Sequence, residues 1–137
     1  MKVVVDTNII FSALYNYKSD AGQLMLAGIE KKIDLFAPEH VQDELKRILI
    51  DKLDYSMRET NETIKSLPIK WVDKEIYKDA ERYAERCLKD EKDIPILACA
   101  LALDADIVSG DKHLLSVKEG IAKAWRLKEL IRKIEVI

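Results

Sequence analysis

Long apolar runs, excess charge of one sign and a cysteine framework are all missing from this sequence. No stretch approaches the roughly 20 apolar residues of a membrane-spanning helix. Lys2 is followed by only three valines before Asp6, which is not the pattern of a signal peptide. The 23 basic and 25 acidic residues give a net charge of −2, so a polyanionic partner would have to meet a local basic face. Cys87 and Cys99 lack metal-type spacing and are typical of the reduced thiols of a cytoplasmic protein.

What the sequence does contain is an alternation of short β-branched runs with longer amphipathic ones. Its 137 residues, 48% of them hydrophobic, suffice for one domain with a real core, taken here as residues 1–137. Strands are predicted at 2–5, 34–36, 69–72, 106–108 and 122–125, and helices at 9–15, 21–31, 38–51, 57–66, 74–89, 94–103 and 127–134. This order predicts a three-layer α/β/α sandwich with a central, mainly parallel sheet of four to five strands. Functional residues of such folds collect beyond the carboxyl ends of the strands.

The first candidate is Asp6, which ends the run VVVDTN directly after a predicted buried strand. Asp6 or Thr7 could simply cap the following helix. The arrival of three polar residues together at a strand end, Asp6, Thr7 and Asn8, favours a functional site instead.

Two further candidates lie on predicted helices. In PEHVQDELKRIL, Glu44 falls beside Val41 and Ile48 at the margin of the apolar stripe, from which a carboxylate can reach inward; a solvated helix acid is the alternative. Asp93 stands immediately before the apolar helix of DEKDIPILACALAL and is a good N-cap, a role compatible with ligand binding. Asp90 and Glu91 are substitutes if this register is wrong.

The last candidate is Asp111, which follows the strand of ADIVSGDKHLL after a turn at Gly110. Two strand ends, one helix margin and one helix start would therefore bring four acids together. Clustered carboxylates repel one another and call for a cation. Oxygen-only ligands select Mg²⁺ or Mn²⁺ over zinc.

With these motifs in order, the chain resembles the PIN-domain family of metal-dependent ribonucleases. The resemblance is carried by VVVDTNIIFSAL, PEHVQDELKRIL and KDIPILACALALDADIVSGDKHLL, and covers essentially the whole chain. The order Asp6, Glu44, Asp93, Asp111 is similar to the family's acidic quartet. The SGDKHLL form is closest to the VapC-like branch, the toxins of toxin–antitoxin modules. The segment GIAKAWRL is more polar and basic than is typical there.

The resemblance implies a Mg²⁺- or Mn²⁺-dependent endoribonuclease with one or two ions, in which a metal-activated water cleaves RNA to leave a 5′-phosphate. Asp6 and Asp111 would be the primary ligands, and Glu44 and Asp93 would hold a second ion or its waters. The resemblance further implies that Thr7, Asn8 and Ser109 orient carboxylates and waters. It also implies an antitoxin partner and a homodimer, for which Leu24, Met25, Leu26 and Ile29 could supply a face.

Basic residues that could track an RNA backbone are fewer and less specific. They are Lys46, Arg47, Lys112 and Arg126, each of which could equally belong to a solvated surface. His40 and His113 are assigned no catalytic role.

Two other functions compete with the nuclease. A haloacid-dehalogenase-type phosphatase also places an acid after its first strand, but it needs a second Asp where this chain has Asn8. The remaining alternatives are a non-catalytic PIN-fold module that binds RNA or protein, and an RNA-processing nuclease without an antitoxin. The complete set of four acids disfavours the non-catalytic module.

Overall fold

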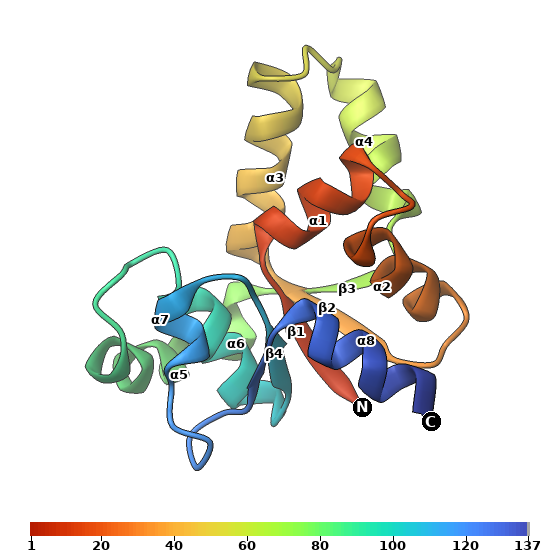
Figure 1. Ribbon diagram of the computed structural model, residues 1–137. Coiled ribbons are helices and arrows are strands. Elements are labelled where there is room, and N and C mark those ends of the chain that lie inside the picture. The colour runs from red at the N-terminus through yellow and green to blue at the C-terminus, as the bar shows by residue number, and fades with distance from the viewer. Residues whose placement is uncertain (137) are drawn as a thin grey trace.

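A computed structural model describes residues 1–136 and shows a five-stranded sheet with helices packed around it (Figure 1). The strands are β1 (Lys2–Val5), β2 (Asp34–Pro38), β3 (Ile69–Val72), β4 (Asp106–Val108) and β5 (Ala124–Trp125). The helices are α1 (Thr7–Tyr15), α2 (Asp20–Ile29), α3 (Glu39–Asp51), α4 (Met57–Ser66), α5 (Lys74–Cys87), α6 (Ile94–Leu103), α7 (Lys112–Leu115) and α8 (Leu127–Val136).

The sheet has the order β3-β2-β1-β4-β5, and every neighbouring pair is parallel. Val4 of β1 lies opposite Phe36 of β2 on one side and Ile107 of β4 on the other. Because β1 is central, the residues that follow β1 and β4 emerge next to each other at the same edge. The predicted α/β/α sandwich is thus confirmed, with a sheet that is entirely parallel.

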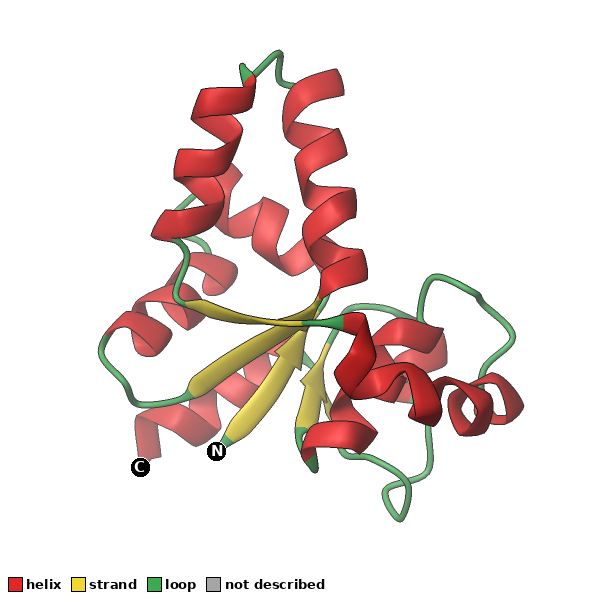
Figure 2. Ribbon diagram, turned by 180° about the vertical axis from the view of Figure 1, so that it is seen from behind, coloured by secondary structure: helices red, strands yellow, loops and turns green. Residues whose placement is uncertain are grey.

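Helices cover both faces of the sheet. The helix pair α5 and α6 packs on one side, and α2 and α8, which contact each other, lie on the other (Figure 1). The helices α3 and α4 form a hairpin that projects beyond the carboxyl end of the strands, as the view from behind shows most clearly (Figure 2). Helix α3 begins beside the edge at which Asp6 and Asp111 emerge, whereas α4 contributes no residue there.

The core explains why these segments form these elements. Val3, Val4 and Val5 are completely buried, as expected for β-branched residues of a central parallel strand. Helix α6 is apolar nearly all round, and Leu97, Ala98 and neighbouring side chains are buried. An apolar helix inserted against the sheet brings its N-terminus, with Asp93, to the strand edge.

Differences from the predicted elements are local. Pro38, predicted to lie in the first turn of a helix, instead ends β2 and occupies the N-cap position of α3. The strand predicted at 122–125 is limited to Ala124–Trp125, and the short helix α7 was not predicted. A four-residue helix carries too little hydrophobic periodicity to be recognised in a sequence.

Within residues 1–136, no helix is both long and apolar enough to cross a membrane. Cys87 and Cys99 are free thiols, as the sequence predicted.

Candidate metal centre at the carboxyl edge of the sheet

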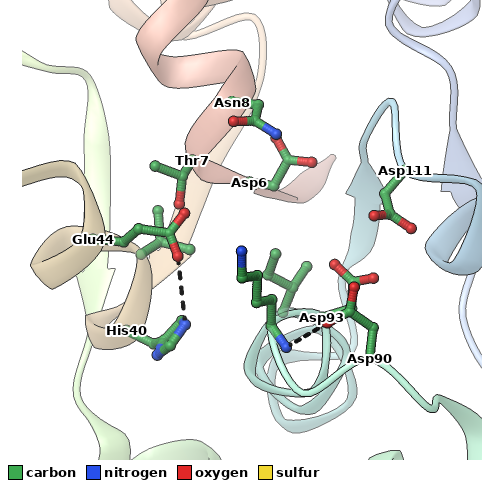
Figure 3. A pocket seen from close by; sticks show the side chains of 11 residues that line it. Asp6, Thr7, Asn8, His40, Glu44, Asp90, Asp93 and Asp111 are labelled. Carbon is green, nitrogen blue, oxygen red and sulfur yellow. Dashed lines mark hydrogen bonds and ion pairs between the residues drawn. The ribbon is translucent and has the colours of Figure 1, made fainter. Parts of the chain in front are cut away.

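A small polar cavity lies where β1 and β4 end, beside the first turns of α3 (Figure 3). Its volume of about 80 Å³ has room for a divalent ion with several waters. The lining residues are Asp6, Thr7, Asn8, His40, Val41, Glu44, Asp90, Lys92, Asp93, Ile96 and Asp111. All four acids of the predicted quartet therefore border one cavity, although they come from four separate segments of the chain.

Asp6 is a capping residue and a cavity residue at once. Its Oδ1 accepts a hydrogen bond from the backbone N–H of Ile9 at 3.1 Å, which caps α1. Its Oδ2 accepts one from the hydroxyl of Ser109. Burial raises the pKa of Asp6, the two hydrogen bonds act in the opposite direction, and the charges of Asp111 and Glu44 raise it further.

Ser109 joins the ends of the two central strands. Besides donating to Asp6, its Oγ accepts a hydrogen bond from the backbone N–H of Asp111 at 2.9 Å, and the side chain is buried. Asp111 in turn caps α7, because its Oδ1 accepts from the N–H of His113 at 2.7 Å. The orientation of both carboxylates is therefore set by the fold.

Asp93 has the least compensated carboxylate of the cavity. It occupies the N-cap position of α6, as predicted, but its side chain makes no capping hydrogen bond to the helix. Asp93 is 5% exposed, and its Oδ2 is buried without a hydrogen-bond donor among residues 1–136. Burial raises the pKa of Asp93 to about 7, helped by the negative charge of Asp111, by a hydrogen bond that protonated Asp93 makes with Asp111, and by the charge of Asp90.

Three of the carboxylates form a compact group. One oxygen each of Asp90, Asp93 and Asp111 lie within 4.8 Å of one another. The sequence offered Asp90 only as a substitute for Asp93, whereas the structure brings both to the cavity. The segment 90–93 is a turn rather than a helix, so no periodicity could show that these two side chains point to the same side.

Glu44 lies on the opposite side of the cavity, on α3, where it faces His40 (Figure 3). The Nε2 of His40 is 3.7 Å from Oε2 of Glu44, one helical turn further along, and has no hydrogen-bond partner within the described residues. His40 therefore borders the cavity, although the sequence assigned it no role. The neighbouring Asp43 is exposed, as the helical periodicity predicted.

The basic residues singled out in the sequence lie outside the cavity. Lys46, Arg47, Lys112 and Arg126 do not line the cavity; Lys112 follows Asp111 directly, and Arg126 lies 3.6 Å from Glu129. Lys92, which the sequence did not single out, does line it. In the sequence, the position of Lys92 between Asp90 and Asp93 is the one feature that could have indicated that it borders the cavity.

The apolar residues suggested for a homodimer face divide into two groups. Leu24 and Met25 are buried in the core and cannot contribute to a surface, which corrects that expectation. Leu26 and Ile29 are exposed, by 53% and 61%.

The fold and the cavity define a class of protein, namely a parallel α/β protein with a carboxylate-lined cavity at the carboxyl edge of its sheet. The chain belongs to the PIN domain family, whose sequence model matches residues 4–134. No curated protein sequence matches the chain significantly.

Solved structures share this fold at low sequence identity. VapBC2 from Rickettsia felis, bound to a DNA fragment from its promoter, is 17% identical, with a TM-score of 0.64, and the match covers 92% of this chain and 98% of that one. VapBC-1 from nontypeable Haemophilus influenzae is 15% identical, with a TM-score of 0.64 and coverage of 93% and 99%. PAE2754 from Pyrobaculum aerophilum is 14% identical, with a TM-score of 0.66 and coverage of 100% and 91%.

Proposed function

We propose that this chain is a Mg²⁺- or Mn²⁺-dependent endoribonuclease and the toxin component of a type II toxin–antitoxin module. The observation that carries the proposal is the convergence of Asp6, Glu44, Asp93 and Asp111 on one cavity. One carboxylate oxygen of Asp93 is buried there with no donor in the part of the chain that the structure describes. A buried, uncompensated carboxylate is costly unless a cation or a proton neutralises it. The residues present fit a hard divalent ion, because the negatively charged ligand atoms that they offer are all carboxylate oxygens.

In this proposal Asp6, Glu44, Asp93 and Asp111 hold one or two ions. When bound, such an ion activates a water and stabilises the negative charge that develops on a phosphodiester. Ser109 keeps Asp6 and Asp111 in register through its two hydrogen bonds. Thr7 and Asn8, which line the cavity, would orient the carboxylates and waters around it.

RNA is the proposed substrate. The presence of a lysine at the cavity favours a polyanionic substrate. Lys92 is exposed and borders the cavity, so its ammonium can neutralise a phosphate next to the acids. Lys46, Arg47, Lys112 and Arg126 would contact the RNA further along its backbone. An accessible, single-stranded backbone suits a cavity of this small size.

The toxin assignment rests on the resemblance of SGDKHLL to VapC-like toxins and on two VapBC structures among the neighbours. We accordingly propose an antitoxin partner, a homodimer and a cytoplasmic site of action. We also propose that residues 1–137 form a single PIN domain.

The nuclease is tested by incubating a mixed RNA pool with Mn²⁺, with and without EDTA. Wild type is expected to cleave only when the metal is free, and Asp6→Asn is expected to be inactive. Asparagine can still accept the N–H of Ile9 and cap α1, so Asp6→Asn separates charge from folding. The matched control is Asp43→Asn, which removes an exposed acid outside the cavity.

Equal activity of wild type and Asp6→Asn would refute the proposal, as would cleavage that EDTA does not affect. Binding of RNA without cleavage under every metal tried would instead identify a non-catalytic module. The toxin role is tested separately by growth arrest on expression and by its reversal when the neighbouring small gene is co-expressed. Cleavage without growth arrest would identify an RNA-processing nuclease.

A further inference from the structure

Two exposed bases flank the segment that links β4 to α7, next to the cavity but outside it. Trp125 of β5 lies opposite Val108 of β4, and its carbonyl accepts a hydrogen bond from the backbone N–H of Ser109 at 3.2 Å. Arg126 follows Trp125, so it leaves β5 beside Ser109, at the edge of the sheet that holds the cavity. Lys112 begins α7, and α7 contacts β5.

Both bases are available to a ligand. Arg126 and its ion-pair partner Glu129 are 3.6 Å apart, and their side chains are 73% and 54% exposed. Such a pair contributes little, so the guanidinium can exchange Glu129 for a phosphate. Lys112 is exposed and makes no ion pair among residues 1–136. Helix α8 begins directly after Arg126, so the partial positive charge of its first turn adds to this side of the cavity.

Gly110 lies in the segment between these bases, at a position where the fold does not require glycine. Its φ is not positive, so the turn is open to other residues. A Cβ added to Gly110 would meet no atom within 4 Å, so packing does not require glycine either. A side chain here would therefore occupy open space at the rim of the cavity. Glycine leaves that space to a ligand that approaches the backbone closely.

The opposite side of the cavity carries the opposite charge. Figure 3 shows His40 and Asp111 on opposite sides of the cavity. His40 also borders a second depression, of about 270 Å³. Three acids and one lysine line this depression, a net charge of −2 with His40 neutral: Glu39, Asp43, Glu81 and Lys74. A phosphodiester chain that left the cavity on this side would be repelled, whereas beside Gly110 it would be attracted.

We propose that the RNA strand crosses the rim of the cavity at Gly110, that Lys112 and Arg126 bind its phosphates there, and that it avoids the acidic depression on the opposite side. This inference rests on the RNA substrate in the proposed function. Among the four bases named there, it places the strand on Lys112 and Arg126 rather than on Lys46 and Arg47. Gly110 is a positioning residue, because its missing side chain lets the strand pass.

The two bases are tested by RNA binding in EDTA, where no cleavage is expected, from the fluorescence anisotropy of a short labelled single-stranded RNA. The double variant Lys112→Ala/Arg126→Ala should raise the Kd by about tenfold or more. It should also reduce the slope of log Kd against log salt by about 1.4, because each phosphate contact on a single strand contributes about 0.7.

The matched control is Lys118→Ala/Arg132→Ala, which removes the same charges from exposed positions that do not flank Gly110. Its Kd should stay within about twofold of wild type. Because both double variants have the same net charge, a difference between them reports the position of the bases.

Gly110 is tested by cleavage kinetics in Mn²⁺. Gly110→Val should raise the KM for RNA by about fivefold or more and change kcat by less than about twofold, because it obstructs binding of the strand. Gly120→Val is the matched control: Gly120 is also exposed, has no positive φ and would place a Cβ in open space, but it lies in the loop before β5. A Gly110→Val variant with reduced kcat and Mn²⁺ affinity but unchanged KM would overturn the inference, because Gly110 would then act through Asp111.

A further measurement uses the wild-type chain and does not depend on how a variant folds. RNA that contains 4-thiouridine is bound in EDTA, irradiated, and the crosslinked peptides are identified by mass spectrometry. Crosslinks are expected within residues 110–113 and 125–128. Crosslinks confined to residues 39–43 and 74–81 would place the strand in the acidic depression and overturn the inference.

The outcomes separate this inference from the proposed function. If wild type cleaves RNA, and Lys112→Ala/Arg126→Ala and Gly110→Val both bind and cleave it equally well, the path is wrong and the nuclease stands. RNA binding that depends on Lys112 and Arg126, in a chain that cleaves no RNA with any metal, supports the path and refutes the nuclease. A wild-type chain that neither binds nor cleaves RNA refutes both.

Discussion

Replacing Asp93 with asparagine should stabilise the metal-free protein while it destroys the metal site. Asp93 is buried beside Asp111 and Asp90, and its pKa is raised from 3.8 to about 7. At about pH 8 the folded protein must hold this carboxylate ionised in an unfavourable place, whereas the unfolded chain ionises it freely. Asparagine has almost the same shape, carries no charge, and can donate to the neighbouring carboxylates.

The magnitude follows from the shift in pKa. Each pKa unit corresponds to about 1.4 kcal/mol, so a shift of about three units sets a ceiling of about 4 kcal/mol for the gain in unfolding free energy. Solvent screening and relaxation of the cavity reduce the gain well below this ceiling, to about 1–2 kcal/mol. A raised carboxyl pKa costs stability as the pH rises from about 4 to about 7, since the unfolded chain then binds fewer protons. The advantage of Asp93→Asn should therefore fall below about 1 kcal/mol near pH 4.

The assay is urea unfolding in EDTA, followed by circular dichroism, at several pH values. The control is Asp79→Asn, which removes an exposed acid of α5 and should change stability by less than about 0.5 kcal/mol. In excess Mn²⁺ the order should reverse, because only wild type gains stability from the ion. If Asp93→Asn is no more stable than wild type in EDTA at pH 8, the argument that the cavity holds an uncompensated charge is wrong.

Three further outcomes are expected. Ser109→Ala removes the buried hydrogen bond to Asp6 that joins the ends of β1 and β4, and the partly buried one from the N–H of Asp111. Urea unfolding should therefore show a loss of about 1–3 kcal/mol, whereas Ser116→Ala, at an exposed hydroxyl, should show little. Mn²⁺ at about 100 times its dissociation constant should stabilise wild type by about 2.7 kcal/mol, seen in calorimetry as a higher melting temperature. EDTA should reverse this increase. An unchanged melting temperature would argue against a metal centre. Lys92→Ala should raise the KM for RNA, because it removes a cation that can contact a phosphate, and it should not weaken Mn²⁺ binding, because that cation lies in an acidic cavity. Lys89→Ala, at an exposed neighbouring residue, should leave both constants unchanged. A weakened Mn²⁺ affinity of Lys92→Ala would contradict the role of Lys92 as a phosphate contact.

The amino-acid sequence determined the elements and much of the site. Three consecutive valines predicted the central strand, and the parallel arrangement placed Asp6 and the residues after β4 at one edge, because parallel strands share their carboxyl ends. Helical periodicity predicted that Glu44 lies at the margin of the apolar face of α3 and that Asp43 points to solvent, and the structure agrees. These predictions succeed because strand and helix periods are local properties of the chain.

Only the tertiary structure decided which residues of irregular segments share the cavity. Asp90 and Lys92 lie in a turn without periodicity, and His40 enters the cavity because α3 stands over the strand edge. The burial of Leu24 and Met25, which the sequence had offered as a surface, likewise depends on how α2 packs. Neither the direction of a turn side chain nor the environment of a carboxylate is encoded locally, since both depend on segments that meet only when the chain is folded.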